Sequence, residues 1–294
     1  MELFIKQVIN GLNTGSIYAL VAVGYTMVYG IIKLINFAHG EVMMFGAYFS
    51  FMFAYMLPFD LPFIVIVIFT MATAAFMGII IERIAYKKLR TAPRISALIT
   101  AIGMSLFLQN LAQLIFGATP WVMKPLVEVR TVDIFGFGIS SLTLLTIALS
   151  VSIMILLSAF VKLTKPGKAM RAVSQDKEAA VLMGININSI ISLTFALGSA
   201  LGALGGIFYA MAYSQIVPTL GVMPGLKAFI AAVLGGIGNI GGAMIGGYLI
   251  GMIETFTKAY ISSKWVDAIV FGLLIVILLF KPSGLLGKNV KEKV

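Results

Sequence analysis

The chain of 294 residues is too apolar for a soluble protein, because 60% of its residues are hydrophobic, only 11% are charged, and its mean hydropathy is +1.05. Soluble domains have about 45–50% apolar and about 25% charged residues, so a water-soluble fold is excluded. The net charge of +10 does not indicate nucleic-acid binding, since the Lys and Arg residues lie mainly between apolar runs, and the absence of Cys excludes disulfides and Cys-based metal or redox sites.

Apolar segments long enough to cross a bilayer recur along the whole chain. Two runs, Ile64 to Ile81 and Ser140 to Val161, carry no charge and approach the length of about 20 residues that spans the hydrocarbon. The first segment lacks a recognisable cleavage site, so we interpret it as a retained span. The sequence predicts one all-α, polytopic transmembrane domain over residues 1–294, with segments at 8–32, 40–57, 61–82, 95–116, 138–161, 189–212, 226–253 and 266–281.

The charges between these segments predict which side of the membrane each connection occupies. Segments 83–94 and 162–177 and the tail from Lys281 are basic, and an excess of Lys and Arg is typical of cytoplasmic loops. Segment 117–137 has balanced charges and 212–226 has none, which favours the outer side for both.

These assignments conflict with an uninterrupted span at 226–253. If 213–225 lies outside and the tail lies inside, the number of crossings is wrong. We therefore expect 226–253 to be two half-helices broken at Gly235 to Gly242, entering and leaving on the same face, as discontinuous helices do in many transporters. The same doubt applies to Ile32 to Gly40, so the side of the N-terminus stays unassigned.

The first candidate residues for a solute path lie between the first two segments. His39 and Glu41 are ionisable and flanked by apolar runs, and Asn36 precedes them. Such groups are costly to bury in a membrane unless they are partnered or hydrated, so they indicate function by default. The alternative is an interfacial turn in which the helix dipole stabilises Glu41. Because His39 is the only histidine, a three-histidine metal site within the chain is excluded.

Residues 162–188 form a long polar and basic segment that we interpret as a docking element for a partner. Pro166 and Gly167 are expected to end the preceding helix, and Ser174 to cap a short helix that ends at Gly184. A short helix with a small-residue face suits a groove on another protein; the alternative is a cytoplasmic loop with an incidental helix. The residues expected to contribute are Arg171, Ser174, Asp176, Glu178, Ala179, Ala180, Leu182 and Gly184.

A glycine-rich run occupies the expected break in the segment 226–253. Gly236 to Gly241 matches G-x-G-x-x-G, but a dinucleotide site requires a strand–turn–helix unit in a soluble sheet, and both flanks here are apolar enough for a membrane. We therefore reject that interpretation. Glycines would instead permit a broken helix whose free backbone groups line a solute path, with candidates at Gly235, Gly236, Gly238, Asn239 and Gly241.

Two further sets of glycines recur at every fourth residue. They are Gly198, Gly202 and Gly206, and Gly238, Gly242 and Gly246. Small residues at this spacing allow helices to approach closely in lipid. We favour packing within the chain over contact with a second subunit.

Several motifs resemble those of ABC importer permeases. Glu178-Ala179-Ala180 followed by Gly184 is similar to their cytoplasmic coupling loop, which often carries Glu-Ala-Ala, three residues and Gly. The Leu-Pro pair expected further on is missing, which argues against a maltose-type permease. The run NFAHGEVMM at 36–44 resembles a signature of the branched-chain amino acid permeases of the LivH type, with further matches at 15–20, 83–90 and 228–242.

The resemblance implies a permease subunit of a bacterial or archaeal importer in the plasma (inner) membrane, carrying leucine, isoleucine and valine. It implies a second, homologous permease, two ATP-binding subunits and an external solute-binding protein as partners. ATP and Mg²⁺ would be used by those partners, while this chain would hold no cofactor and catalyse no reaction; it has no Walker A pattern. The alternatives are the same architecture carrying urea, amides or other amino acids, and a secondary transporter or channel, which would place charged residues deep in its spans.

Overall fold

The computed structural model describes residues 2–90, 92–134 and 137–287. Within them the chain is almost entirely helical, which confirms the predicted all-α class. The α-helices are α1 (Glu2–Ile32), α2 (His39–Tyr55), α3 (Phe63–Ile81), α4 (Arg94–Phe116), α5 (Ser141–Leu163), α6 (Lys165–Gln175), α7 (Lys177–Leu182), α8 (Ile187–Tyr213), α9 (Val222–Gly235), α10 (Ile240–Tyr260) and α11 (Val266–Phe280). The shorter elements are a π-helix η1 (Glu82–Tyr86), two 3-10 turns η2 (Lys87–Leu89) and η3 (Ser263–Trp265), and an antiparallel hairpin of β1 (Thr131–Ile134) and β2 (Phe137–Ser140).

Seven helices in the described residues are long and apolar enough to cross a membrane. The chain is therefore a multi-pass membrane protein. One of the seven is α11 together with η3, over Ser263–Phe280. Helices α2 and α9 have 17 and 14 residues, and at 1.5 Å per residue neither reaches across a hydrocarbon layer of about 30 Å.

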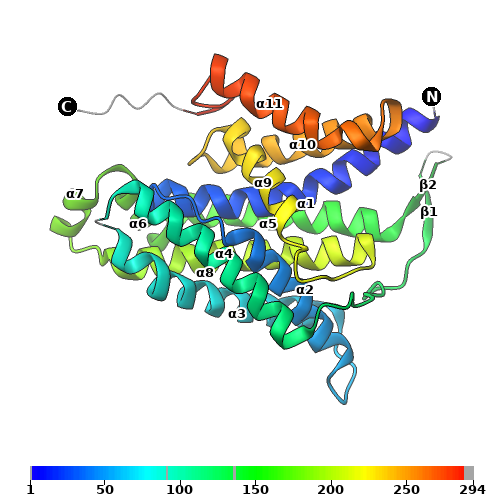
Figure 1. Cartoon of the computed structure of the whole chain (residues 1–294), viewed down its shortest axis with the longest axis horizontal. Coiled ribbons are helices and arrows are strands. Elements are labelled where there is room, and N and C mark those ends of the chain that lie inside the picture. Colours follow the sequence, from blue (N-terminus) through cyan, green and yellow to red (C-terminus); the bar gives the residue numbers. More distant parts are fainter. Residues whose placement is uncertain (1, 91, 135–136, 288–294) are drawn as a thin grey trace.

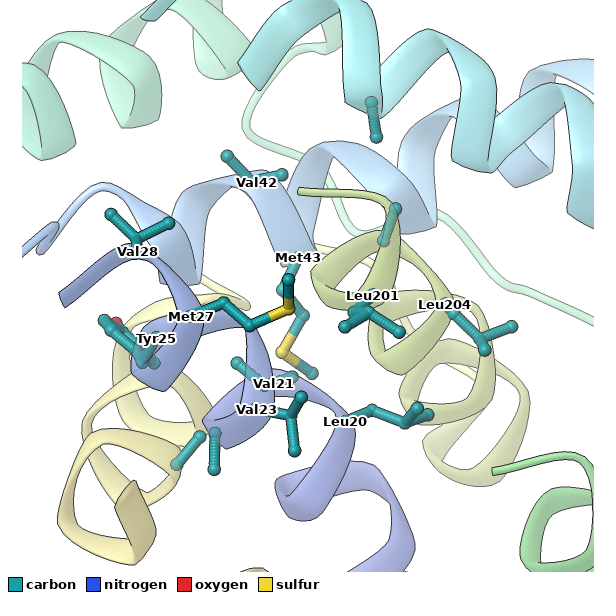
Figure 2. Close-up of a cluster of buried hydrophobic side chains, with 14 of the residues drawn as sticks. Leu20, Val21, Val23, Tyr25, Met27, Val28, Val42, Met43, Leu201 and Leu204 are labelled. Atoms are coloured by element: carbon teal, nitrogen blue, oxygen red, sulfur yellow. The ribbon is translucent and has the colours of Figure 1, made fainter. Parts of the chain in front are cut away.

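Helix α1 is the buried centre of the molecule and packs against α8, α9 and α10. Small residues permit this packing: a Cβ added at Gly15 would come within 2.8 Å of the Tyr248 backbone on α10. Figure 2 shows the apolar core beside it, where Met27 of α1, Met43 of α2 and Leu201 of α8 converge. Helices α3, α4, α5 and α11 carry many exposed apolar side chains, as expected for surfaces that face lipid or another subunit.

The glycines that recur at every fourth residue pack against other helices of the chain, as predicted. Gly202 of α8 lies against the ring of His39, and a Cβ added at Gly202 would come within 3.1 Å of the His39 Cε1. Gly206 faces the backbone of Met43, Gly242 that of Gly235, and Gly246 that of Ala231. These contacts bring α8 close to α2 and α10 close to α9.

The two ends of the molecule differ in charge. Helices α6 and α7 lie at one end, while the N-terminus and the β1–β2 hairpin lie at the other (Figure 1). Arg90 donates a hydrogen bond to the Asn188 side chain (2.5 Å), so the basic segment after α3 lies beside the start of α8 at the α7 end. The N-terminus, which the sequence left unassigned, is thus opposite the basic end. Lys288, Lys291 and Lys293 of the predicted basic tail lie outside the described residues.

Both short helices begin inside the molecule rather than at an end. Figure 1 shows α2 and α9 starting near the middle of the long axis. Their first turns touch, because Gly40 packs against Gly221 and Gly225, and a Cβ on Gly225 would come within 2.8 Å of the Gly40 Cα. The doubt that the sequence left over Ile32 to Gly40 is thereby resolved, since α1 ends at Ile32 and α2 begins at His39 inside the molecule.

The predicted break in 226–253 is also confirmed, but its shape differs from the expected pair of half-helices. The chain turns at residues 236–239, near the basic end, and α10 then has 21 residues. Of α9 and α10, only α9 is short, since the chain before it re-enters the molecule without helical structure at 214–221. The chain still enters and leaves on the same face, because α9 runs toward the basic end and α10 runs back from it (Figure 1).

Candidate functional site

The polar segment 162–188 begins with a sharp corner between α5 and α6. Thr164 caps α6, because its Oγ1 accepts a hydrogen bond from the N–H of Gly167 (3.2 Å). Pro166 suits the first turn, where its missing N–H would have no intrahelical partner. A Cβ at Gly167 would come within 2.5 Å of the Val161 Cα. These residues end α5 and begin α6, which confirms the predicted break.

The predicted cap at Ser174 is wrong: the short helix α7 begins at Lys177, and a further helix, α6, which the sequence did not predict, precedes it. Ser174 lies in the last turn of α6 and donates to the carbonyl of Arg171 (2.7 Å). The backbone becomes extended at Asp176, whose carboxylate caps α7 by accepting from the N–H of Ala179 (3.0 Å). Because Thr164 has already started a helix, Ser174 is helical when the chain reaches it, and Asp176 is an equally good capping residue.

Gly184 ends α7, as predicted. Its φ of +78° is left-handed, a conformation that glycine adopts without steric penalty. Its N–H donates to the Val181 carbonyl (2.9 Å), and the N–H of Ile185 donates to that of Ala180 (3.0 Å). This arrangement satisfies the last carbonyls of the helix.

The exposed tip of α7 is apolar. Leu182 and Met183 are 87% and 82% exposed, and Ala179 and Glu178 are exposed beside them. Ala180 instead is buried, so the expected small face of Ala179 and Ala180 is divided between outside and inside. An apolar tip on a polar segment is typical of a contact surface, and the docking role of these residues stays a prediction.

A small cavity brings the polar segment and the glycine-rich break together. Arg171 and Ser174 of α6 line a space of about 70 Å³ with Gly238 and Ile240. Gly30 of α1 also lines this space and lies against Gly238. Arg171 also donates to the carbonyl of Lys162 at the end of α5 (3.2 Å). Movement of α6 would therefore reach both α1 and the turn between α9 and α10.

The glycine-rich break is closed by the chain that follows α11. Gly236 and Gly238 have positive φ values of +105° and +94°. Asn239 caps α10 by accepting from the N–H of Gly242 (3.2 Å) and donates to the carbonyl of Leu286 (2.8 Å). The carbonyls of Leu234 and Gly235 accept from Leu285 (2.7 Å) and Leu286 (3.1 Å). These two carbonyls are not free; whether Gly235, Gly236, Gly238, Asn239 and Gly241 lie on a solute path stays a prediction.

Asn36 and His39 are buried in contacts with neighbouring helices. The Asn36 Oδ1 accepts a hydrogen bond from the hydroxyl of Tyr86 (2.8 Å). His39 has its Nε2 3.2 Å from the Val21 carbonyl, and its ring meets that of Tyr25 edge-on at 4.6 Å between centroids. Both side chains thus help to hold the start of α2 against its neighbours.

Glu41 differs from these residues because it faces a cavity. Its Oε1 accepts hydrogen bonds from Ser105 (3.0 Å) and Gln109 (2.9 Å) of α4. Its Oε2 has no partner among the described residues. The cavity has a volume of about 180 Å³ and lies between the first turns of α2 and α9 and the middle of α4.

Sequence reasoning missed several polar residues in these helices. Ser105 and Gln109 lie one turn apart in an apolar segment, and this spacing was the available signal for them. Glu82 and Glu254 are 1% and 2% exposed and were not singled out. Carboxylates in otherwise apolar spans are a sufficient signal for both.

The comparisons with known proteins agree on one family. Residues 7–279 match the family described as branched-chain amino acid transport system / permease component. The chain is 42% identical over 301 residues to the high-affinity branched-chain amino acid transport system permease protein LivH of Escherichia coli (strain K12), covering 99% of this chain and 98% of that protein.

Further relatives include one that carries another solute name. The permease protein BraD of Pseudomonas aeruginosa, from a system of the same description as LivH, is 43% identical over 99% of this chain and 98% of its own length. The ribose import permease protein RbsC of Haemophilus influenzae is 25% identical over 93% of this chain and 84% of its own length. The chain belongs to the family of branched-chain amino acid transport system permease components, which confirms the resemblance found in its sequence.

Proposed function

We propose that this chain is the transmembrane permease subunit of an importer for leucine, isoleucine and valine. The observation that carries the proposal is the 42% identity, from end to end, to a permease named for high-affinity branched-chain amino acid transport. The ribose permease, at 25% identity, supports the permease class but gives weaker support for a sugar as the solute.

The proposal includes a complex in which other subunits supply the energy. These are a second, homologous permease, two ATP-binding subunits that use ATP and Mg²⁺, and an external solute-binding protein. The exposed apolar tip at Leu182 and Met183 supports a docking role, since such a tip is otherwise unfavourable in water.

The positive-inside rule supports the orientation of the chain in the bacterial or archaeal plasma (inner) membrane. The basic end with α6 and α7 would lie in the cytoplasm, and the N-terminus and the β1–β2 hairpin outside. In this orientation α7 would meet the ATP-binding subunits. Their closure would move α6, which touches α1 and the α9–α10 turn through the cavity lined by Arg171 and Gly238.

Uptake of radiolabelled leucine tests the proposal. Cells that express the chain with its partner subunits are expected to accumulate leucine, and cells that lack the ATP-binding subunits are not. Accumulation without any ATP-binding subunit would contradict the proposal and favour a secondary transporter. Displacement of leucine from the binding protein by urea or an amide would instead indicate that the importer carries that compound.

A variant at the end of α7 tests the coupling step. Replacement of Gly184 by Val forces a β-branched residue into a left-handed conformation, so uptake is expected to be lost while membrane insertion persists. Gly272→Val in α11 is the matched control, since a Cβ at Gly272 meets nothing within 4 Å and its φ is not positive. Normal uptake by G184V would count against a docking role for α7.

A further inference from the structure

The unpartnered oxygen of Glu41 indicates that the cavity beside it binds a ligand. Glu41 is 1% exposed, and two donors from α4 bind the same oxygen, Oε1. Its Oε2 is buried without a partner among the described residues. A buried carboxylate needs hydrogen bonds or a counter-charge to remain ionised. Because Glu41 lines the cavity, a donor bound there could supply the partner that Oε2 lacks.

The lining of the cavity is polar at one side and apolar at the other. Glu41 and Ser105 form its polar part, whereas Phe37, Ile102 and Leu106 provide an apolar wall. A volume of about 180 Å³ is smaller than the ~300–1,000 Å³ typical of pockets for drug-sized ligands. A small molecule with a cationic head and an aliphatic body therefore fits both the size and the lining.

A second charged feature is the first turn of α9, which also lines the cavity. Helix α9 begins at Val222, after Gly221, which provides no side-chain cap. The start of a helix carries partial positive charge from the aligned peptide dipoles. The first turn of α2 already contains the Glu41 carboxylate, which offsets its dipole. The first turn of α9 lines the cavity with Gly221, Val222 and Gly225, so it faces the space without an acidic side chain of its own among these residues.

We infer that this cavity binds a small aliphatic amino acid as its zwitterion, with the ammonium group on Glu41 Oε2. The carboxylate would lie toward the first turn of α9, and the alkyl group against Phe37, Ile102 and Leu106. The close packing of Gly40 with Gly221 and Gly225 holds the two helix starts at this spacing. The identity of the solute rests on the proposed function, whereas the recognition of an ammonium group rests on Glu41.

Thiol protection in the purified full transporter complex, without the solute-binding protein, tests this site. Because the chain has no Cys, L106C adds a single thiol at the cavity wall. F107C is the matched control, since Leu106 and Phe107 are 54% and 58% exposed but only Leu106 lines the cavity. The rate of modification of this chain by a small methanethiosulfonate reagent would be read by mass spectrometry, with leucine, isoamylamine or isocaproate added.

Leucine and isoamylamine, which share the ammonium group, are expected to slow modification of L106C, while isocaproate, which lacks it, does not. F107C is expected to react at one rate throughout. In E41Q/L106C the affinity for both amines should fall about tenfold or more, since a hydrogen bond to a charged group is replaced by a neutral one. Protection by isocaproate equal to that by leucine, protection that persists in E41Q/L106C, or absence of protection by every ligand would overturn the site.

The outcome separates this site from the proposed function. The analogue series uses an intact Glu41, so it remains decisive if E41Q fails to assemble. Leucine uptake in cells without protection of L106C would reject the site and leave the proposed function standing. Protection by isoamylamine in a complex that does not take up leucine would support the ammonium-binding site and contradict leucine as the transported solute.

Discussion

At the scale of single residues, the buried carboxylates show how an apolar chain accommodates charge. Glu254 of α10 accepts hydrogen bonds from Tyr18 of α1 (2.7 Å), Lys227 of α9 (3.0 Å) and Lys258 (2.5 Å). Lys227 also pairs with Asp267 at the start of α11 (2.9 Å). One carboxylate thus joins three helices and links them to a fourth, so the group is buried with its counter-charges rather than alone.

The two lysines on Glu254 are expected to differ in their contribution to stability. The Lys227 side chain is 9% exposed, whereas that of Lys258 is 41% exposed. K227M should lower the free energy of unfolding by about 3 kcal/mol, because it removes one partner of a buried pair. K258M should lower it by about 1 kcal/mol or less, because exposed pairs contribute little. Thermal unfolding of the two variants in the same detergent would show this order, and equal losses would mean that Lys227 is more hydrated than its contacts indicate.

Glu82, near the basic end, is also a buried carboxylate with partners. It pairs with Arg90 and accepts a hydrogen bond from Ser192 of α8 (2.8 Å). Burial, together with the nearby positive charges of Arg90 and Lys33, lowers the pKa of Lys177 at the start of α7. The positive charges of Lys33 and Arg90 therefore act on Lys177 at the start of α7.

At the scale of elements, the features that the sequence could predict are those set by neighbouring residues. Gly184 ends α7 and the run Gly235 to Gly242 interrupts a helix, since both depend on the backbone freedom of local glycines. The partners of Glu41 could not be predicted, because Ser105 and Gln109 are 64 and 68 residues away. Their contact depends on how α4 packs across α2, which no local pattern encodes.

The division between α6 and α7 can be tested by removing the side chains of Asp176 and Ser174 in turn. D176A removes the acceptor for the Ala179 N–H and should destabilise α7 by about 1 kcal/mol. Amide exchange in residues 177–182 should then accelerate about fivefold. S174A is the control, because Ser174 bonds only within α6. Faster exchange in α7 for S174A than for D176A would restore the cap at Ser174 that the sequence predicted.

At the scale of the whole molecule, two helices that start midway give the chain its internal cavity. α2 and α9 are separated by the length of six other α-helices in sequence, yet their first turns touch through Gly40 and Gly221. A helix that spans the whole layer would place its first N–H groups at the surface, whereas these two place theirs in the interior. The orientation of the whole bundle then decides which side this interior site opens toward in each state of transport.

Labelling of introduced thiols tests that orientation. Leu3 near the N-terminus and Leu182 at the tip of α7 are 58% and 87% exposed. Because the chain has no Cys, a cysteine introduced at either position is its single thiol. A membrane-impermeant maleimide should label L3C in intact spheroplasts and L182C only after permeabilisation, because the basic end is expected to lie inside. Coexpression of the ATP-binding subunits should then slow labelling of L182C in permeabilised cells and leave L3C unchanged. Labelling of L182C in intact spheroplasts would mean that the chain has the opposite orientation in the membrane. Equal labelling with and without the ATP-binding subunits would mean that they contact another part of the chain.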